Sequence, residues 1–266
     1  MPLGLVCLDV DGTLVGHAGV PTDGVWKAAD RARAAGIHLA ICTARLGLGS
    51  AWDWATRLDP DGWHMFQTGA SIMHTGTGQA HSTPLPSGSV EEGGAIAAEH
   101  SWVFELYADT DYVVDDDRPV TLAHAALLGL PFVRRRLSDL RGDPLRAQYI
   151  VIDADVELAI ALVPKGCVAS SATSPIIAGH HFVSITDESV SKASGVRALA
   201  TLLGLELSQV MMVGDGQNDV SALVVAGHAV AMGNAHPEAV AVADYVVAHV
   251  ERDGVADALD LAITLD

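Results

Sequence analysis

The chain has 266 residues, of which 50% are hydrophobic and 18% are charged, a composition typical of a packed globular protein and not of a disordered one. Its 15 basic and 33 acidic residues give a formal net charge of −18, which disfavours nucleic acid and anionic membrane surfaces as main partners. A phosphorylated substrate would also be repelled at long range, so a site for one must supply its own local cations.

The first elements alternate between strands and helices. An apolar strand at 3–8 is followed by a helical pattern at 23–35, a strand at 37–42, a helix at about 48–58 and a short strand at 63–67. This alternation predicts a parallel sheet with right-handed crossover connections.

The pattern changes at 84–88, where two prolines, a serine and a glycine indicate a linker. The segment 84–186 begins and ends with helix–strand–strand patterns, which indicates a separate α+β module, and the α/β alternation resumes with a helix at 191–203. We therefore expect an α/β fold with a Rossmann-like parallel-sheet core formed by 1–83 and 187–266, into which the α+β domain is inserted.

The three cysteines give little functional information. Cys7, Cys42 and Cys167 lie in or beside apolar runs and match no metal or disulfide spacing, so we expect a reducing, cytoplasmic setting. Asp9 and Asp11 interrupt the first apolar stretch, and we expect neither a signal peptide nor a membrane partner.

Polar side chains follow the predicted strands at the point where each strand ends. Lys192 opens the helix that leads into the buried strand at 210–213. Because the carboxyl ends of parallel strands meet at one edge of a sheet, these side chains are expected to converge there. Two ionised carboxylates about 4 Å apart repel each other by roughly 4 kcal/mol at an effective dielectric near 20. We therefore expect a cation, a shared proton or a reaction that offsets this repulsion. The residues that follow strands are Asp9, Asp11, Thr43, Arg45, Asp215 and Asp219.

The side-chain types are complementary in their chemistry. Carboxylates without a His or Cys cluster suit a hard cation, most simply Mg²⁺. A hydroxyl, a lysine and the N–H groups of a helix start suit a phosphate. One aspartate as nucleophile and a second as general acid and base would split phosphoryl transfer into two displacements through an aspartyl-phosphate.

Four segments, in this order, resemble the motifs of the haloacid dehalogenase-like hydrolases. The interval of 149 residues between the second and third motifs fits the branch with a large cap inserted there. Three further segments resemble the Cof-type phosphatases with a class IIB cap. The four motifs are 9–14 (Asp-Val-Asp-Gly-Thr-Leu), Thr43, Lys192 and 214–219 (Gly-Asp-Gly-Gln-Asn-Asp), and the further segments are 231–235, 243–246 and 253–256.

The resemblance implies roles for the acidic residues. Asp9 would attack phosphorus and also bind Mg²⁺. Asp11 would protonate the leaving alcohol and then activate water, while its backbone carbonyl contacts the metal. Asp215 would be a metal ligand, and Asp219 would be a ligand or lie directly behind the ligands.

The resemblance also implies phosphate-binding residues. Thr43 and Lys192 would hold the phosphoryl oxygens, with Lys192 neutralising charge during transfer, and Asn218 would orient phosphate or substrate. Arg45 is a candidate for substrate contact, although the chain reads Thr-Ala-Arg where the family often reads Thr-Gly-Arg. The arginine run 134–136 is typical of a solvated cap surface, with contact to an acidic substrate group as the alternative.

From the sequence we expect a Mg²⁺-dependent phosphatase acting on phosphomonoesters of small metabolites, with phosphosugars as the leading class by family analogy. The cap would supply the substrate specificity. Two alternatives stay open, a phosphomutase of the same superfamily and a phospho-ligand binding protein without turnover. The sequence does not decide the oligomeric state or the choice between Mg²⁺ and Mn²⁺.

Overall fold

The computed structural model describes residues 2–174 and 176–265, and the chain divides into two compact units. The second unit extends a few residues past both ends of the predicted insertion. It also includes the short segment Leu46–Ser50, which the sequence pattern assigned to the core. The pattern did not reveal this segment, because five residues are too few to produce a change in composition. Unit 1 consists of Met1–Arg45, Ala51–His81 and Ser191–Asp266, and unit 2 of Leu46–Ser50 and Ser82–Val190.

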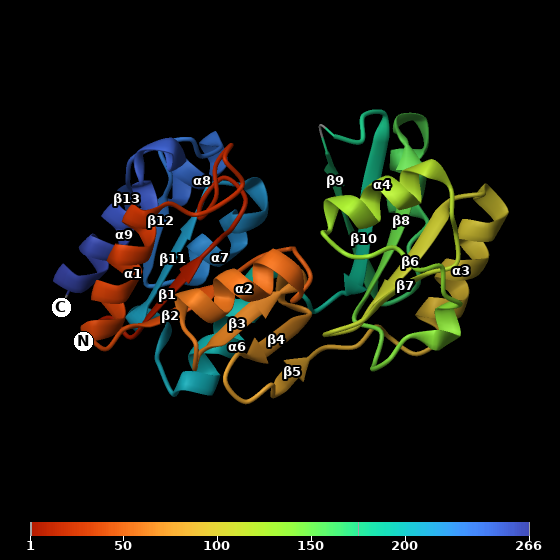
Figure 1. Ribbon diagram of the computed structural model, residues 1–266. Helices are drawn as coiled ribbons and strands as arrows, with labels where there is room; N and C mark the ends of the chain where they lie inside the picture. The colour runs from red at the N-terminus through yellow and green to blue at the C-terminus, as the bar shows by residue number, and fades with distance from the viewer. Residues whose placement is uncertain (1, 175, 266) are drawn as a thin grey trace. The chain divides into compact units, whose positions relative to one another are not determined.

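Unit 1 is built on a five-stranded parallel sheet with the strand order β13-β12-β11-β1-β2 (Figure 1). The central strands β1 and β11 are buried along their whole length, which explains why both are continuous apolar runs rather than alternating ones. The strands are β1 Leu5–Leu8, β2 His38–Ile41, β11 Val210–Gly214, β12 His228–Ala231 and β13 Tyr245–Val246.

Helices cover both faces of this sheet. On one face α1 and α9 pack together and share an apolar cluster with β1 and β11. On the other face α6 and α7 pack together over a second cluster. The first helix buries alanines and a valine at helical spacing. The helices of this unit are α1 Asp23–Ala34, α6 Lys192–Leu203, α7 Val220–Val225, α8 Pro237–Val242 and α9 Gly254–Thr264, with α2 Gly49–Leu58 beginning in the segment assigned to unit 2.

A small three-stranded sheet follows α2, in the order β3-β4-β5. The strand β3 (Trp63–Phe66) matches the predicted strand at 63–67. The strands β4 (Ser71–His74) and β5 (Ala80–Ser82) were not predicted, because they are short and lack a clear apolar alternation.

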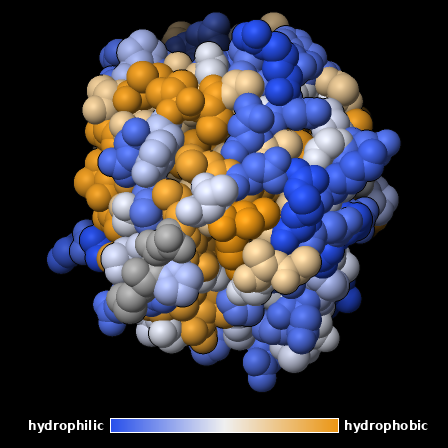
Figure 2. Space-filling view, turned by 90° about the vertical axis from the view of Figure 1, so that its left-hand side faces the viewer, coloured by the Kyte–Doolittle hydropathy of each residue, from blue (hydrophilic) through white to orange (hydrophobic). Residues whose placement is uncertain are grey.

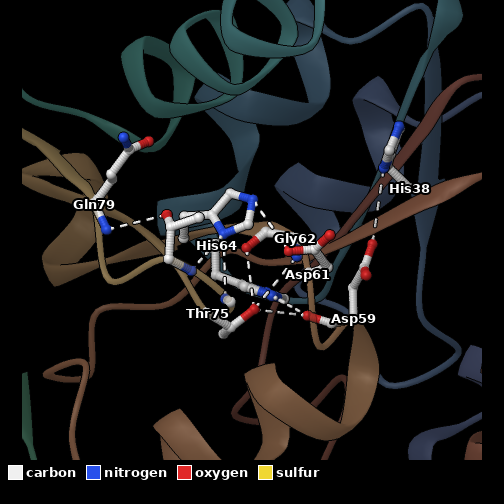
Figure 3. Close-up of polar contacts among 10 residues, drawn as sticks. His38, Asp59, Asp61, Gly62, His64, Thr75 and Gln79 are labelled. Carbon is white, nitrogen blue, oxygen red and sulfur yellow. Dashed lines mark hydrogen bonds and ion pairs between the residues drawn. The ribbon is translucent and has the colours of Figure 1, made fainter.

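A buried histidine joins this small sheet to the main one. The Nδ1 atom of His64 accepts a hydrogen bond from the Ile41 N–H at 3.2 Å. Its Nε2 lies 3.0 Å from the carbonyl oxygen of Asp59, to which it must therefore donate. The Thr75 hydroxyl donates to the same carbonyl at 2.9 Å. Figure 3 shows His64, Asp59 and Thr75 gathered beside Gly62. Burial lowers the pKa of His64 to about 4, so the neutral ring is the folded form.

Unit 2 contains a five-stranded antiparallel sheet in the order β7-β6-β8-β10-β9. The helices α3 and α5 pack on one face of the sheet and α4 packs on the other. The α/β core and the antiparallel α+β unit agree with the predicted fold class. The elements of this unit are α3 Ser89–His100, β6 Val103–Tyr107, β7 Tyr112–Val114, α4 Pro119–Leu127, β8 Arg146–Ile152, α5 Val156–Ala161, β9 Cys167–Thr173 and β10 His180–Asp187.

The edge strand β13 leaves apolar side chains at the surface. Val246 is 58% exposed and Tyr245 is 37% exposed, and Figure 2 shows hydrophobic residues gathered on the side of the molecule where Figure 1 draws this strand. A two-residue edge offers little backbone for pairing with another chain. No helix in residues 2–174 and 176–265 combines the length and the apolar run that a membrane span needs.

The buried His64 predicts a loss of stability in mild acid. An unfolded histidine titrates near pH 6.5, whereas the pKa of His64 in the folded chain is about 4. Between these values the unfolded chain binds more protons, so this residue makes the free energy of unfolding rise with pH. Its contribution falls by about 3 kcal/mol as the pH is lowered from 7 to 4.

The measurement is urea denaturation of the wild type and of His64→Gln at several values between pH 4.5 and 7. Gln retains a donor and an acceptor but does not titrate, so the variant should show a shallower pH dependence of the unfolding free energy. The control His81→Gln alters an exposed ring beside the same sheet and should leave the slope unchanged. Equal slopes in wild type and His64→Gln would contradict the assignment.

Candidate active site

The site begins where β1 ends. Asp9 follows directly and is 6% exposed. Its N–H donates to the carbonyl of Val213 at 2.9 Å, so the strand pairing continues through it. The chain then turns at Gly12, whose φ is +84°. A Cβ atom at Gly12 would lie 2.2 Å from Oδ2 of Asp215. Only glycine therefore fits this turn, and its absence of a side chain lets the ends of β1 and β11 come together.

Lys192 supplies the buried positive charge of the site. It is the first residue of α6 and is 1% exposed. The helix starts there because the Ser191 hydroxyl accepts the N–H of Ser194 at 3.0 Å. The Nζ atom donates to Oδ1 of Asp9 at 2.6 Å and to Oδ1 of Asp219. Burial opposes the ammonium form, but the two carboxylates outweigh it and raise the pKa of Lys192, so the lysine stays charged.

Asp219 closes the loop that follows β11. Its Oδ2 accepts the N–H groups of Asp215 at 3.0 Å and of Gly216 at 2.8 Å. Its Oδ1 faces Lys192, and the side chain is fully buried. Protein donors therefore engage both of its oxygens. This carboxylate fixes the loop and the lysine together.

Asp215 is held by two side chains from other parts of the chain. Its Oδ1 accepts the Thr13 hydroxyl at 2.9 Å, and Oδ2 accepts Nδ2 of Asn234 at 3.3 Å. Asn234 also donates to the carbonyl of Gly12 at 2.8 Å and accepts the N–H of Val250 at 2.9 Å. No role for Asn234 was predicted from the sequence. Its position just after the end of β12, at the same edge of the sheet, was the available signal.

Three of the acidic residues lie close enough together to hold a cation. Carboxylate oxygens of Asp9, Asp215 and Asp219 lie within 4.8 Å of one another. Burial and the neighbouring carboxylates raise the pKa of Asp9 to about 7, against the effect of Lys192. Burial likewise raises the pKa of Asp215 to about 6. This set of oxygen donors fits Mg²⁺, whose charge would favour the ionised form of both carboxylates.

The carboxylate of Asp11 lies outside this group and pairs with Arg45. The Nε atom of Arg45 is 3.0 Å from Oδ2 of Asp11, and Nη2 is 2.6 Å from Oδ1. The guanidinium carbon lies 5.2 Å from the ring centre of Trp54. The side chain of Asp11 is 62% exposed and that of Arg45 37% exposed. The structure therefore pairs Arg45 with Asp11, the candidate general acid and base. The candidate metal ligand of Asp11 is its backbone carbonyl, not its carboxylate.

The two remaining predicted residues differ in burial. Thr43 is 1% exposed, follows the end of β2, and its hydroxyl accepts the N–H of Arg45 at 3.1 Å. Asn218 is exposed in the 3₁₀ turn after β11. The structure thus brings Asp9, Asp215, Asp219 and Lys192 into one cluster and leaves Asn218 at the surface beside it.

Comparison with known proteins identifies relatives along nearly the whole chain. The sequence model of haloacid dehalogenase-like hydrolases matches residues 6–259. YxeH of Bacillus subtilis, named as a candidate phosphatase, is 27% identical over 267 residues, which cover 96% of each chain. A phosphoglycolate phosphatase of Methanothermobacter thermautotrophicus is 31% identical over 170 residues, or 62% of this chain and 71% of its own.

Solved structures share the same fold. A haloacid dehalogenase-like hydrolase from Bacteroides thetaiotaomicron has a TM-score of 0.84 at 21% identity, covering 97% of this chain and 99% of that one. A structure described as the subclass IIB sugar phosphatase BT4131 has a TM-score of 0.81 at 20% identity, covering 98% and 99%. Since the family model spans residues 6–259, almost all of the sequence, the chain belongs to the haloacid dehalogenase-like hydrolases.

Proposed function

We propose that this hydrolase is a Mg²⁺-dependent phosphatase that acts on small phosphorylated metabolites through an aspartyl-phosphate intermediate. The observation that carries the proposal is the buried cluster in which Lys192 pairs with Asp9 and Asp219, beside Asp215. A cluster of this kind combines a fixed nucleophile, a cation for phosphoryl oxygens and a place for a metal.

Asp9 is the proposed nucleophile. Lys192 fixes one of its carboxylate oxygens at 2.6 Å, and attack on phosphorus requires the ionised form. The pKa of about 7 without metal would leave much of the carboxyl protonated at neutral pH. Lys192 and a bound cation both favour ionisation, so the nucleophile and the cation site depend on each other.

Asp11 is the proposed general acid and base. Its exposed carboxylate can reach a leaving group at the surface of unit 1, and the two-point contact with Arg45 restricts its orientation. We therefore assign Arg45 chiefly to the positioning of Asp11. Thr43 and Lys192 are the proposed partners of the phosphoryl oxygens, and Asn218 would contact substrate at the rim.

The proposed ligands of Mg²⁺ are the carboxylates of Asp9 and Asp215 and the backbone carbonyl of Asp11. Asp219 lies behind them, because protein donors already engage both of its oxygens. The bound cation would neutralise charge on the phosphoryl group during its transfer. Thr13 and Asn234 orient Asp215 for this purpose.

The substrate is proposed to be a small phosphomonoester, with phosphosugars as the leading class. The support is the fold shared with a structure described as a sugar phosphatase and the relative named a phosphoglycolate phosphatase. The inserted segment 84–186 would act as the cap that selects the substrate and excludes water from the reaction. We propose a cytoplasmic setting, with neither nucleic acid nor membrane as partner.

Asp9→Asn should lower phosphate release by at least roughly 10³-fold, because the amide cannot act as the nucleophile. The measurement is phosphate release from a panel of phosphorylated metabolites, with Mg²⁺ and with EDTA, and circular dichroism to check the fold. The matched control Asp53→Asn, at an exposed position in α2, should retain activity. Undiminished turnover in Asp9→Asn would refute the assignment, and isomerised ester without free phosphate would indicate a phosphomutase.

Mg²⁺ should stabilise the wild-type protein against heat. A ligand that binds only the folded state at 100 times its dissociation constant adds about 2.7 kcal/mol, or roughly 5–10 °C in the unfolding midpoint for a chain of this size. Asp215→Asn should lose most of this increase, because it removes a charged ligand, whereas Asp53→Asn should keep it. Thermal melts with increasing Mg²⁺ make the comparison, and an equal increase in all three proteins would place the metal elsewhere.

A further inference from the structure

Unit 2 carries a group of three polar side chains on one face of its antiparallel sheet. Ser171 lies in β9, His181 lies in the adjacent strand β10, and Asp153 follows the end of β8 directly. In the register of β9 and β10, His181 lies opposite Thr173, two residues beyond Ser171. Residues two apart on a strand point to the same face of a sheet, so the serine and the histidine share one face.

The three side chains follow one another in the order hydroxyl, imidazole and carboxylate. The Ser171 hydroxyl oxygen lies 2.9 Å from Nδ1 of His181, which is an ordinary hydrogen-bond distance. On the other side of the ring, Nε2 lies 3.5 Å from Oδ1 of Asp153. This second distance is long, as distances between catalytic groups often are before a substrate binds. The order is that of a nucleophile, its base and a carboxylate that orients the base.

The position of Asp153 decides which nitrogen of the neutral ring can act as a base. An ionised carboxylate only accepts hydrogen bonds, so Asp153 favours the form of His181 that carries its proton on Nε2. Nδ1 is then the unprotonated nitrogen, and the Ser171 hydroxyl donates its hydrogen bond to it. The ring is therefore oriented to take the hydroxyl proton of Ser171.

Exposure makes the serine the accessible end of this group. Ser171 is exposed in its strand, whereas the ring of His181 is 24% exposed. The strand β9 forms one edge of the five-stranded sheet, and an edge strand turns every second backbone N–H away from its neighbour. Such N–H groups are the usual donors to the oxyanion that forms when a hydroxyl attacks a carbonyl carbon.

We propose that Ser171 is a reactive nucleophile that takes up the acyl group of small, uncharged, activated carboxylic esters. An uncharged ester is favoured because the net charge of −18 repels an anionic one. This inference goes beyond the proposed phosphatase function and does not depend on it, because the three side chains all belong to unit 2.

The step needs no co-reactant besides the ester. A bond forms between Oγ of Ser171 and the carbonyl carbon, and the bond from that carbon to the oxygen of the leaving group breaks with its electron pair. His181 takes the hydroxyl proton at Nδ1 and passes it to the departing oxygen or to water. The products are an acyl-serine and the free alcohol or phenol.

The test uses the full-length protein and 4-nitrophenyl acetate. Acid quenching and peptide mass spectrometry should place an acetyl group on Ser171 of the wild type, in step with release of 4-nitrophenol. His181→Gln should slow acetylation of Ser171 at least about tenfold, because general-base catalysis is lost. Asp153→Asn should slow it at least about threefold, because an amide no longer favours the proton on Nε2. Circular dichroism checks that each variant folds.

Ser170→Ala is the matched control. Ser170 is an exposed serine of the same strand, and as the neighbour of Ser171 it points to the opposite face of the sheet. Its loss should leave the acetylation of Ser171 unchanged. A wild type without acetyl on Ser171 would refute the proposal, as would equal rates of acetylation at Ser171 in the wild type, His181→Gln and Asp153→Asn.

Discussion

The structure of unit 1 depends on one electrostatic problem, the packing of carboxylates at the ends of two adjacent buried strands. The parallel register pairs Leu8 with Val213, so the residues that follow, Asp9 and the loop with Asp215, must lie side by side. Burial, together with the neighbouring carboxylates, raises the pKa values of Asp9 and Asp215. Lys192 offsets part of the repulsion from a third position in the chain, and a divalent cation would offset the rest.

Protein donors around the site hold these charged groups in place. Asp219 uses both of its oxygens to hold the loop and the lysine, and Asn234 joins Asp215 to the turn at Gly12. A site assembled in this way requires little reorganisation when charge moves during phosphoryl transfer. The same construction makes the site sensitive to isosteric changes, because both oxygens of Asp215 and both oxygens of Asp219 accept hydrogen bonds from protein donors.

The sequence was sufficient to predict the sheet and the acidic cluster because both follow from local rules. Apolar runs become buried parallel strands, and polar residues that end such strands meet at one edge. The partner of Arg45 could not be predicted in this way. Arg45 and Asp11 follow different strands, and only the actual turn geometry decides whether the guanidinium meets a carboxylate or a phosphate. The role of Asn234 was missed for the same reason, since its three contacts lie 222, 19 and 16 residues away in sequence.

The acidic net charge of the chain makes the burial of each cation important for binding an anion. With only 15 basic residues against 33 acidic ones, the chain gains nothing from its overall field when it binds an anion. Lys192 places one buried cation at the proposed phosphoryl site, where its attraction would be strong and little screened by salt. An exposed cation such as Arg141 attracts an anion more weakly, because salt and water screen its charge. A buried cation of this kind, and not the overall field of the chain, would therefore supply the attraction for a phosphoryl group.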